Sequence, residues 1–175
     1  MIKAGVLGAG HLGKIHLRLL AASERYELVG FFDPDKKNAA ALASEKGYQY
    51  FNSPEALIDA CEIIDIVTPT VFHHQVAQQA LQAGKHIFIE KPIANSLSEA
   101  REITEMAKKH QVLGQVGHVE RFNPAFKAVA DSITHPKFIE SHRLAEFNPR
   151  GTDVPVVLDL MIHDLDILLS IVNAK

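Results

Sequence analysis

The stretch Ile2-Lys3-Ala4-Gly5-Val6-Leu7-Gly8-Ala9-Gly10-His11-Leu12-Gly13 decides the fold. Its first six residues are mainly apolar and predict a buried strand, and the residues after them predict a helix. Three glycines join the two at the spacing G-x-G-x-x-G. Gly8 permits a tight turn, Gly10 lets a phosphate approach the backbone, and Gly13 lets the helix pack closely on the strand. By itself the run is equally compatible with an ordinary glycine turn.

Short apolar runs alternate with longer helical patterns as far as residue 116. The predicted strands are Ile2–Leu7, Leu28–Asp33, Ile63–Thr68, His86–Glu90 and Val112–Val116, with a weaker one at Tyr48–Phe51. The predicted helices are His11–Ala22, Lys36–Lys46, Pro54–Ala60, Phe72–Ala83 and Leu97–His110. Strands that are apolar throughout are typical of sheets covered on both faces. Strands alternating with helices form βαβ units, so the sequence predicts an α/β fold with a Rossmann-type, doubly wound parallel sheet.

Asp33 supplies the second half of a dinucleotide-binding pattern. It ends the second predicted strand, 20 residues after Gly13, where an acid accepts hydrogen bonds from ribose hydroxyls. The predicted cofactor contacts are therefore Gly8, Gly10, His11, Leu12, Gly13 and Asp33. A carboxylate here repels a 2′-phosphate, so we expect NAD rather than NADP, although Lys36 and Lys37 weaken that preference. The alternative is an aspartate that only starts a turn.

The composition excludes several classes of protein. The 175 residues are 47% hydrophobic and 22% charged, as in a globular protein, and the net charge of −3 gives no attraction to nucleic acid. No apolar run approaches the length of a membrane span, which needs about 20 residues. The N-terminal apolar run lacks a small-residue cleavage site. A single cysteine, Cys61, excludes an internal disulfide framework, so we expect a cytoplasmic protein.

The pattern changes after about Gly117. Asn123–Ile133 predicts a helix, Lys137–Glu146 a strand, and Val156–Val172 a helix that is apolar on nearly all sides, reached through a loop with Pro149, Gly151 and Pro155. Such a helix needs packing partners on most sides, and the strand has no sheet to join. We therefore expect a Rossmann domain at 1–121 and the beginning of an α+β domain at 122–175 that is incomplete in this chain.

Two tripeptides, Thr68-Pro69-Thr70 and Glu90-Lys91-Pro92, follow predicted strands. The carboxyl ends of parallel strands are where open α/β sheets bind ligands. Lys91 lies between apolar segments, and partial desolvation would lower its pKa toward a useful acid–base range. A salt bridge with Glu90 or another acid is the structural alternative.

Asp159 and His163 are four residues apart on one predicted helix face, which Asp166 continues. They could place an imidazole and a carboxylate around one substrate hydroxyl. A His–Asp pair that ties the helix to its neighbours is the structural alternative. We expect no metal, because no further ligand accompanies the pair. Most other histidines, including His16, are expected to be structural or surface residues.

Together these motifs resemble the glucose–fructose oxidoreductase / inositol dehydrogenase / MocA family. The resemblance runs from Gly8–Gly13 and Asp33 through Thr68-Pro69-Thr70 with His73, and through Ala80–His86, to Glu90-Lys91-Pro92 and the pair Asp159 and His163. Two stretches, Gly117–Pro124 and Asp159–Asp166, are similar to members that act on UDP-N-acetylglucosamine-type nucleotide sugars. Many members have glycine where Met161 stands.

The resemblance implies an NAD(P)-dependent oxidoreductase of sugars, nucleotide sugars or cyclitols, with a Rossmann domain and a C-terminal sheet domain that forms homo-oligomers. It implies a catalytic site of Lys91, Asp159 and His163. Further cofactor contacts would come from Thr68, Pro69, His73, Glu90 and Lys91, and substrate contacts from Arg121 and Asn123. His163 is the expected base, with the reverse assignment to Lys91 open. A non-catalytic NAD sensor and a reductase of a non-sugar carbonyl or imine are the other candidate functions.

Overall fold

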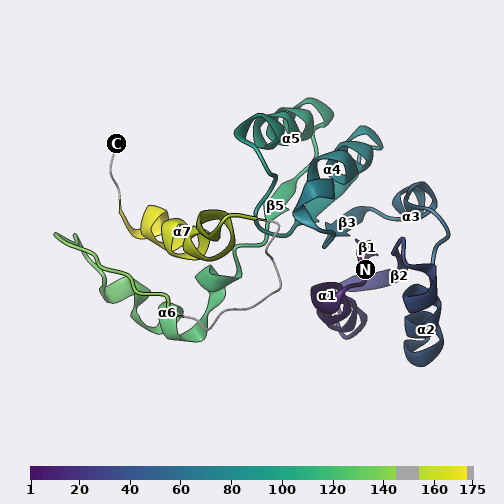
Figure 1. Ribbon diagram of the computed structural model, residues 1–175, viewed down its shortest axis with the longest axis horizontal. Coiled ribbons are helices and arrows are strands. Elements are labelled where there is room, and N and C mark those ends of the chain that lie inside the picture. The colour runs from purple at the N-terminus through teal and green to yellow at the C-terminus, as the bar shows by residue number, and fades with distance from the viewer. Residues whose placement is uncertain (145–153, 173–175) are drawn as a thin grey trace. The chain divides into compact units, whose positions relative to one another are not determined.

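Five parallel strands form one sheet in the order β2-β1-β3-β4-β5 (Figure 1). The strands are β1 (Ile2–Leu7), β2 (Tyr26–Phe32), β3 (Ile63–Ile66), β4 (His86–Ile89) and β5 (Gly114–Val116). The chain runs from β1 outward to β2 on one side of the sheet and from β3 outward to β4 on the other. The loops that follow β1 and β3, which are neighbouring strands, therefore lead in opposite directions. This arrangement confirms the predicted Rossmann-type α/β fold.

The computed structural model describes residues 1–144 and 154–172. The chain divides into two units, Met1–Val116 and Gly117–Lys175. The domains predicted from the sequence, 1–121 and 122–175, stay a prediction. Among the described residues, no helix is long and apolar enough to cross a bilayer.

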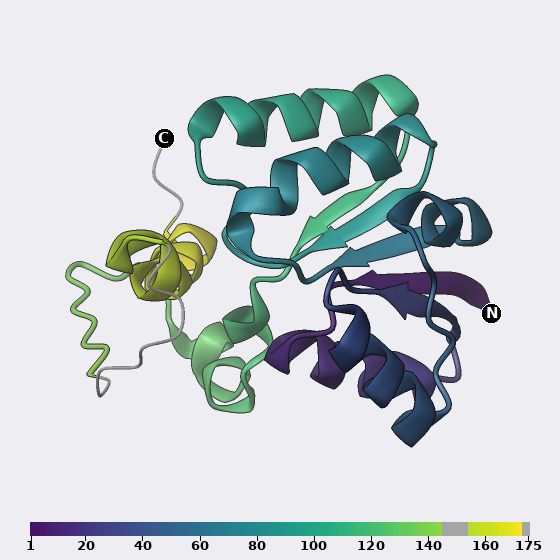
Figure 2. The same ribbon diagram turned by 45° about the vertical axis from the view of Figure 1, so that its right-hand side comes forward.

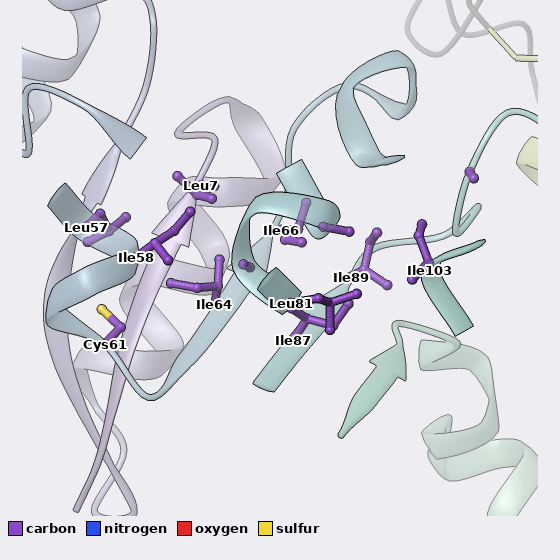
Figure 3. Packing of buried hydrophobic residues seen from close by; sticks show 13 residues of the cluster. Leu7, Leu57, Ile58, Cys61, Ile64, Ile66, Leu81, Ile87, Ile89 and Ile103 are labelled. Atoms are coloured by element: carbon purple, nitrogen blue, oxygen red, sulfur yellow. The ribbon is translucent and has the colours of Figure 1, made fainter. Parts of the chain in front are cut away.

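Helices cover both faces of the sheet (Figure 2). On one face, α1 (His11–Ala21) and α2 (Lys36–Lys46) pack on an apolar cluster that includes Val6, Leu17 and Phe31. On the other, α3 (Pro54–Ala60), α4 (His73–Gln82) and α5 (Leu97–His110) pack on a larger cluster. Figure 3 shows that larger cluster, in which isoleucines of β3 and β4 meet side chains of the three helices. Two buried faces explain why the strands are apolar throughout.

Side-chain caps set where three helices begin. Asp35 accepts a hydrogen bond from the Asn38 backbone N–H at the start of α2, and Ser53 accepts one from Ala56 before α3. Ser96 forms a reciprocal capping box with Glu99 before α5. These caps satisfy backbone N–H groups that have no partner inside the helix. The predicted bounds of all three helices are confirmed.

Two predicted strands differ from the structure. The weak strand at Tyr48–Phe51 is reduced to one isolated parallel bridge between Tyr50 and Phe31, beside the edge strand β2. The strand predicted at Lys137–Glu146 is wrong over 137–144, and its last two positions lie outside the described residues. Alternating polarity alone does not make a strand, because the backbone also needs a neighbouring strand to bond with.

The regular secondary structure described in the second unit is all helical. It contains η2 (Val119–Phe122), α6 (Pro124–Val129), η3 (Ala130–Ser132), η4 (Val157–Met161) and α7 (Ile162–Ile171), while a short turn in the first unit, η1 (Thr70–Phe72), precedes α4. The predicted C-terminal helix, Val156–Val172, is confirmed to within one residue at each end. Its first part, η4, is a π-helical turn that the sequence analysis did not predict.

Candidate active site

Two glycines of the G-x-G-x-x-G run after β1 are required by the fold itself. Gly8 has a φ of 99°, which side-chain-bearing residues rarely adopt, and its N–H donates to the Phe32 carbonyl at 2.9 Å. A Cβ at Gly8 would lie 2.6 Å from the Val67 backbone oxygen. A Cβ at Gly13 would collide with the Gly8 carbonyl oxygen. These contacts bring β1, β3 and α1 close together around the turn.

Gly10 is different, because nothing in the chain requires it. A Cβ at Gly10 would meet no atom within 4 Å, and the residue is exposed. Gly10 is also the N-cap of α1, where no side chain caps the helix and no acid occupies the first turn. Among the described residues, the first N–H groups of α1 therefore have no side-chain cap, and the positive end of the helix dipole lies there. This geometry fits the pyrophosphate of a dinucleotide.

Asp33 is held beside this loop. One carboxylate oxygen, Oδ2, accepts a hydrogen bond from the Ala9 backbone N–H at 2.7 Å, and Oδ1 accepts one from Asp35 at 2.8 Å. Each oxygen retains a further acceptor site. The side chain is half-buried directly after β2, so it can also accept bonds from the hydroxyls of a ribose.

His73 ties together the loops that follow β3 and β4. Its Nδ1 lies 2.9 Å from the Pro92 carbonyl oxygen and its Nε2 lies 2.9 Å from that of Thr68. The residue is 1% exposed and both ring nitrogens face these loops, and its predicted contact with the cofactor stays a prediction. The Thr68 hydroxyl is buried and makes no hydrogen bond within the described part of the chain. A buried polar atom without a partner at the ligand-binding edge fits a cofactor contact there.

Lys91 and Glu90 follow β4 at the same edge. Glu90 Oε2 accepts a hydrogen bond from the Lys91 backbone N–H at 3.3 Å, and both side chains are half-buried. Its other oxygen, Oε1, lies 3.4 Å from Nε2 of His16 on α1. His16 Nδ1 in turn lies 2.8 Å from Asp65 Oδ2 on β3. The Asp65 carboxylate, in the middle of an apolar strand, is a signal in the sequence that could have revealed this cluster.

The acids determine the charge of His16. Burial alone would lower the pKa of His16, but its hydrogen bonds with Asp65 and Glu90 and their negative charges outweigh burial and raise the pKa to about 10. Burial raises the pKa of Asp65, while the hydrogen bond with His16 opposes that rise. At neutral pH His16 is thus an imidazolium with a carboxylate beside each ring nitrogen. His16, expected from the sequence to be a structural or surface residue, is a half-buried member of this charged cluster.

The second unit carries the other predicted catalytic residues. Asp159 lies on the π-helical η4 and His163 on α7, both half-buried. Such π-turns within helices are often found at functional sites. Lys91 belongs to the first unit, so a single site that contains all three residues stays a prediction.

Two predicted substrate contacts are engaged within the second unit. Arg121 forms a two-pronged ion pair with Asp166, at 2.6 and 2.7 Å, and this hydrogen-bonded guanidinium lowers the pKa of Asp166. Asn123 caps α6 by accepting a bond from Ala125, and it donates to Glu120. Their roles toward a substrate stay predictions. Within residues 1–144 and 154–172, no group of three or more His, Cys, Asp or Glu side chains is placed to hold a metal ion.

Comparison with known protein families identifies the family of this chain. Residues 2–118 match the Gfo/Idh/MocA oxidoreductase family, which is described as having an NAD-binding Rossmann fold. The chain belongs to this family. The glycine loop, Asp33 and Lys91 all lie inside the matched range, and the predicted NAD cofactor is therefore confirmed for this family member. Asp159 and His163 lie beyond it.

Individual relatives match nearly the whole chain. A UDP-N-acetylglucosamine 3-dehydrogenase from Acidithiobacillus ferrooxidans is 39% identical in an alignment of 175 positions that covers 99% of this chain and 55% of the relative. Its solved structure superimposes with a TM-score of 0.92, covering 99% of this chain and 57% of that one. A scyllo-inositol 2-dehydrogenase (NAD(+)) from Bacillus subtilis is 32% identical over 99% of this chain and 55% of its own. The chain thus spans about half the length of these relatives.

Proposed function

We propose that the intact enzyme is an NAD-dependent dehydrogenase that oxidises a hydroxyl carbon of a sugar, nucleotide sugar or cyclitol to a ketone. The observation that carries this proposal is the open helix N-terminus at Gly10, beside Asp33 and at the same sheet edge as Lys91. NAD, when bound, supplies the acceptor for the hydride that leaves the carbon. The hydroxyl proton must go to a protein group.

We assign that proton to His163, which acts as the general base. Lys91 donates a hydrogen bond to the same substrate oxygen and stabilises the negative charge that develops on it. Asp159 orients either the imidazole or a neighbouring substrate hydroxyl. In the reverse assignment Lys91 is the base. Removal of Lys91, rather than of His163, would then abolish the fall in kcat at low pH that protonation of the base causes.

A nucleotide sugar is the preferred substrate class. Support comes from the 39% identity to a UDP-N-acetylglucosamine 3-dehydrogenase over nearly the whole chain. Arg121 and Asn123 would then contact the substrate or hold the helices that do. We further propose a cytoplasmic protein, because the chain has one buried cysteine, and a homo-oligomer when intact, as the resemblance to the family implies.

A substrate panel tests this proposal. The intact enzyme is mixed with NAD and, in separate reactions, nucleotide sugars, free sugars and cyclitols, and NADH is followed by its absorbance. Turnover that is lost in the His163→Ala variant supports the assignment. Binding of NAD without turnover of any substrate would support the non-catalytic sensor instead. Oxidation of NADH only by a non-sugar carbonyl or imine would favour the reductase.

A further inference from the structure

The face of the sheet that α1 covers contains a charged cluster beside its apolar cluster. Along β3 and β4, Ile64, Ile66, Ile87 and Ile89 belong to the apolar cluster on the other face. Side chains alternate between faces, and Asp65 pairs in register with Phe88, so Asp65 and Glu90 share the α1 face with Phe88. Asp65 is only 7% exposed. A carboxylate buried to this degree needs a partner.

His16 is that partner, and its side chain joins helix α1 both to β3 and to the segment after β4. Its ring lies between Asp65 on β3 and Glu90 after β4, and it also contacts the Phe88 ring at a centroid distance of 6.0 Å. These two acids are the charged groups that act on His16. Because an imidazolium has two N–H donors, it can hold both carboxylates at once. Its helix, α1, starts at the glycine loop.

The tripeptide Glu90-Lys91-Pro92 is held by a histidine on each side of Lys91. Before Lys91, the Glu90 carboxylate contacts His16 through one oxygen and accepts the Lys91 backbone N–H through the other. After Lys91, the Pro92 carbonyl oxygen lies 2.9 Å from His73 Nδ1. His16 comes from α1 on one face of the sheet, and His73 comes from the start of α4 on the other.

We propose that His16 and His73 form a histidine clamp that positions Lys91, His16 through the Glu90 carboxylate and His73 through the Pro92 carbonyl. Both are positioning residues, because neither is placed to contact the reacting atoms. The clamp also connects the glycine-loop helix, through His16, to the loop that carries Lys91. The proposal rests on the proposed function in one respect: the catalytic role of Lys91 comes from that function.

A purely stabilising role accounts less well for this arrangement. A buried ion pair gains little over apolar residues of the same volume, because removing charges from water is costly. Asp65 Oδ1 makes no hydrogen bond within the described residues, so the cluster is not even fully satisfied. An apolar contact would serve packing better, but it could not orient the Glu90 carboxylate toward the Lys91 N–H.

Amide hydrogen exchange of Lys91, measured by NMR on this chain, tests the clamp. In His16→Gln and in His73→Gln we expect Lys91 to exchange about tenfold faster relative to the core amide of Ile64, as the loss of one hydrogen bond implies. The matched control is His74→Gln, because His74 neighbours His73 on α4 but pairs with Glu102. We expect no change in the relative exchange of Lys91 in this control.

Unchanged relative exchange in both clamp variants would overturn the proposal. If a variant does not fold, the wild-type chain still decides, since a Lys91 amide that exchanges as fast as an exposed one contradicts the clamp. In the intact enzyme, we expect either variant to lower kcat by about tenfold to a hundredfold through misplacement of Lys91, a larger factor than any change in the Kd for NADH. Amide exchange needs no turnover, so a failed clamp and a failed dehydrogenase assignment give different results.

Discussion

Replacing Gly8 and Gly10 by alanine separates what the fold needs from what the cofactor needs. In Gly8→Ala the backbone keeps a φ of 99°, which costs a side-chain-bearing residue about 1–3 kcal/mol. The new Cβ also lies 2.6 Å from the Val67 oxygen and 2.9 Å from the Thr68 nitrogen, and overpacking against such atoms adds about 1–3 kcal/mol. The free energy of unfolding should therefore fall by about 2–6 kcal/mol, which lowers Tm by about 5–20 °C.

Gly10→Ala should behave in the opposite way. Its φ of −68° and ψ of −161° suit alanine, and the new Cβ meets no atom within 4 Å. The stability should change by less than about 1 kcal/mol, because the loss of a glycine N-cap and the smaller entropy of the unfolded chain offset each other. The methyl group, however, occupies the path of the pyrophosphate, so NADH should bind at least about tenfold more weakly.

Thermal unfolding and calorimetric titration with NADH measure both quantities on the same samples. A Tm loss in Gly10→Ala as large as that in Gly8→Ala would refute the structural argument. Undiminished NADH affinity in Gly10→Ala would refute the placement of the pyrophosphate.

Three further predictions concern charge, core and catalysis. The raised pKa of His16 contributes stability that is complete below about pH 6.5 and is lost as the pH rises toward about 10. Denaturant titrations should show the free energy of unfolding falling as the pH rises through this window, and an equally steep fall in His16→Gln would contradict it. Ile66→Ala should cost about 2–5 kcal/mol of stability, because the side chain is fully buried, and a smaller loss in the same titration would count against the packing shown in Figure 3. In the intact enzyme, Lys91→Met and His163→Ala should each lower kcat by about 10²–10⁴-fold while NADH affinity persists, and near-wild-type kcat in either would return that residue to a structural role.

Local signals in the sequence predicted most of the first unit. The helices at Lys36–Lys46, Pro54–Ala60 and Leu97–His110 were predicted with the bounds observed, because a side-chain cap or an N-terminal proline determines where each begins. The strands were found from their apolar runs, but four of the five differ by one or more residues at an end. Strand ends depend on hydrogen bonds to neighbouring strands, which the sequence does not contain.

Tertiary context decided the cases in which prediction failed. The alternating residues 137–144 have the polarity of a strand without a neighbour to pair with, and they form none. Tyr50 reaches β2 only through a single bridge. The π-turn at Val157–Met161 also has no simple sequence signature.

The candidate site was predicted unevenly for a related reason. The glycine spacing and Asp33 are local patterns that carry their own physical meaning, so they predict where the cofactor binds. His16, Asp65 and Glu90 are far apart in the sequence, and their partnership depends on the register of β3 and β4. Likewise, nothing local indicates that Arg121 pairs with Asp166 across 45 residues.

Calorimetric titration of this chain with NADH and NADPH tests the central claim most directly. The glycine loop and the Asp33 carboxylate predict one NADH bound per chain, with NADPH bound more weakly because its 2′-phosphate meets that negative charge. The Asp33→Ala variant should narrow the difference between the two cofactors. Absence of NADH binding, or binding of NADPH as tight as that of NADH, would contradict the account.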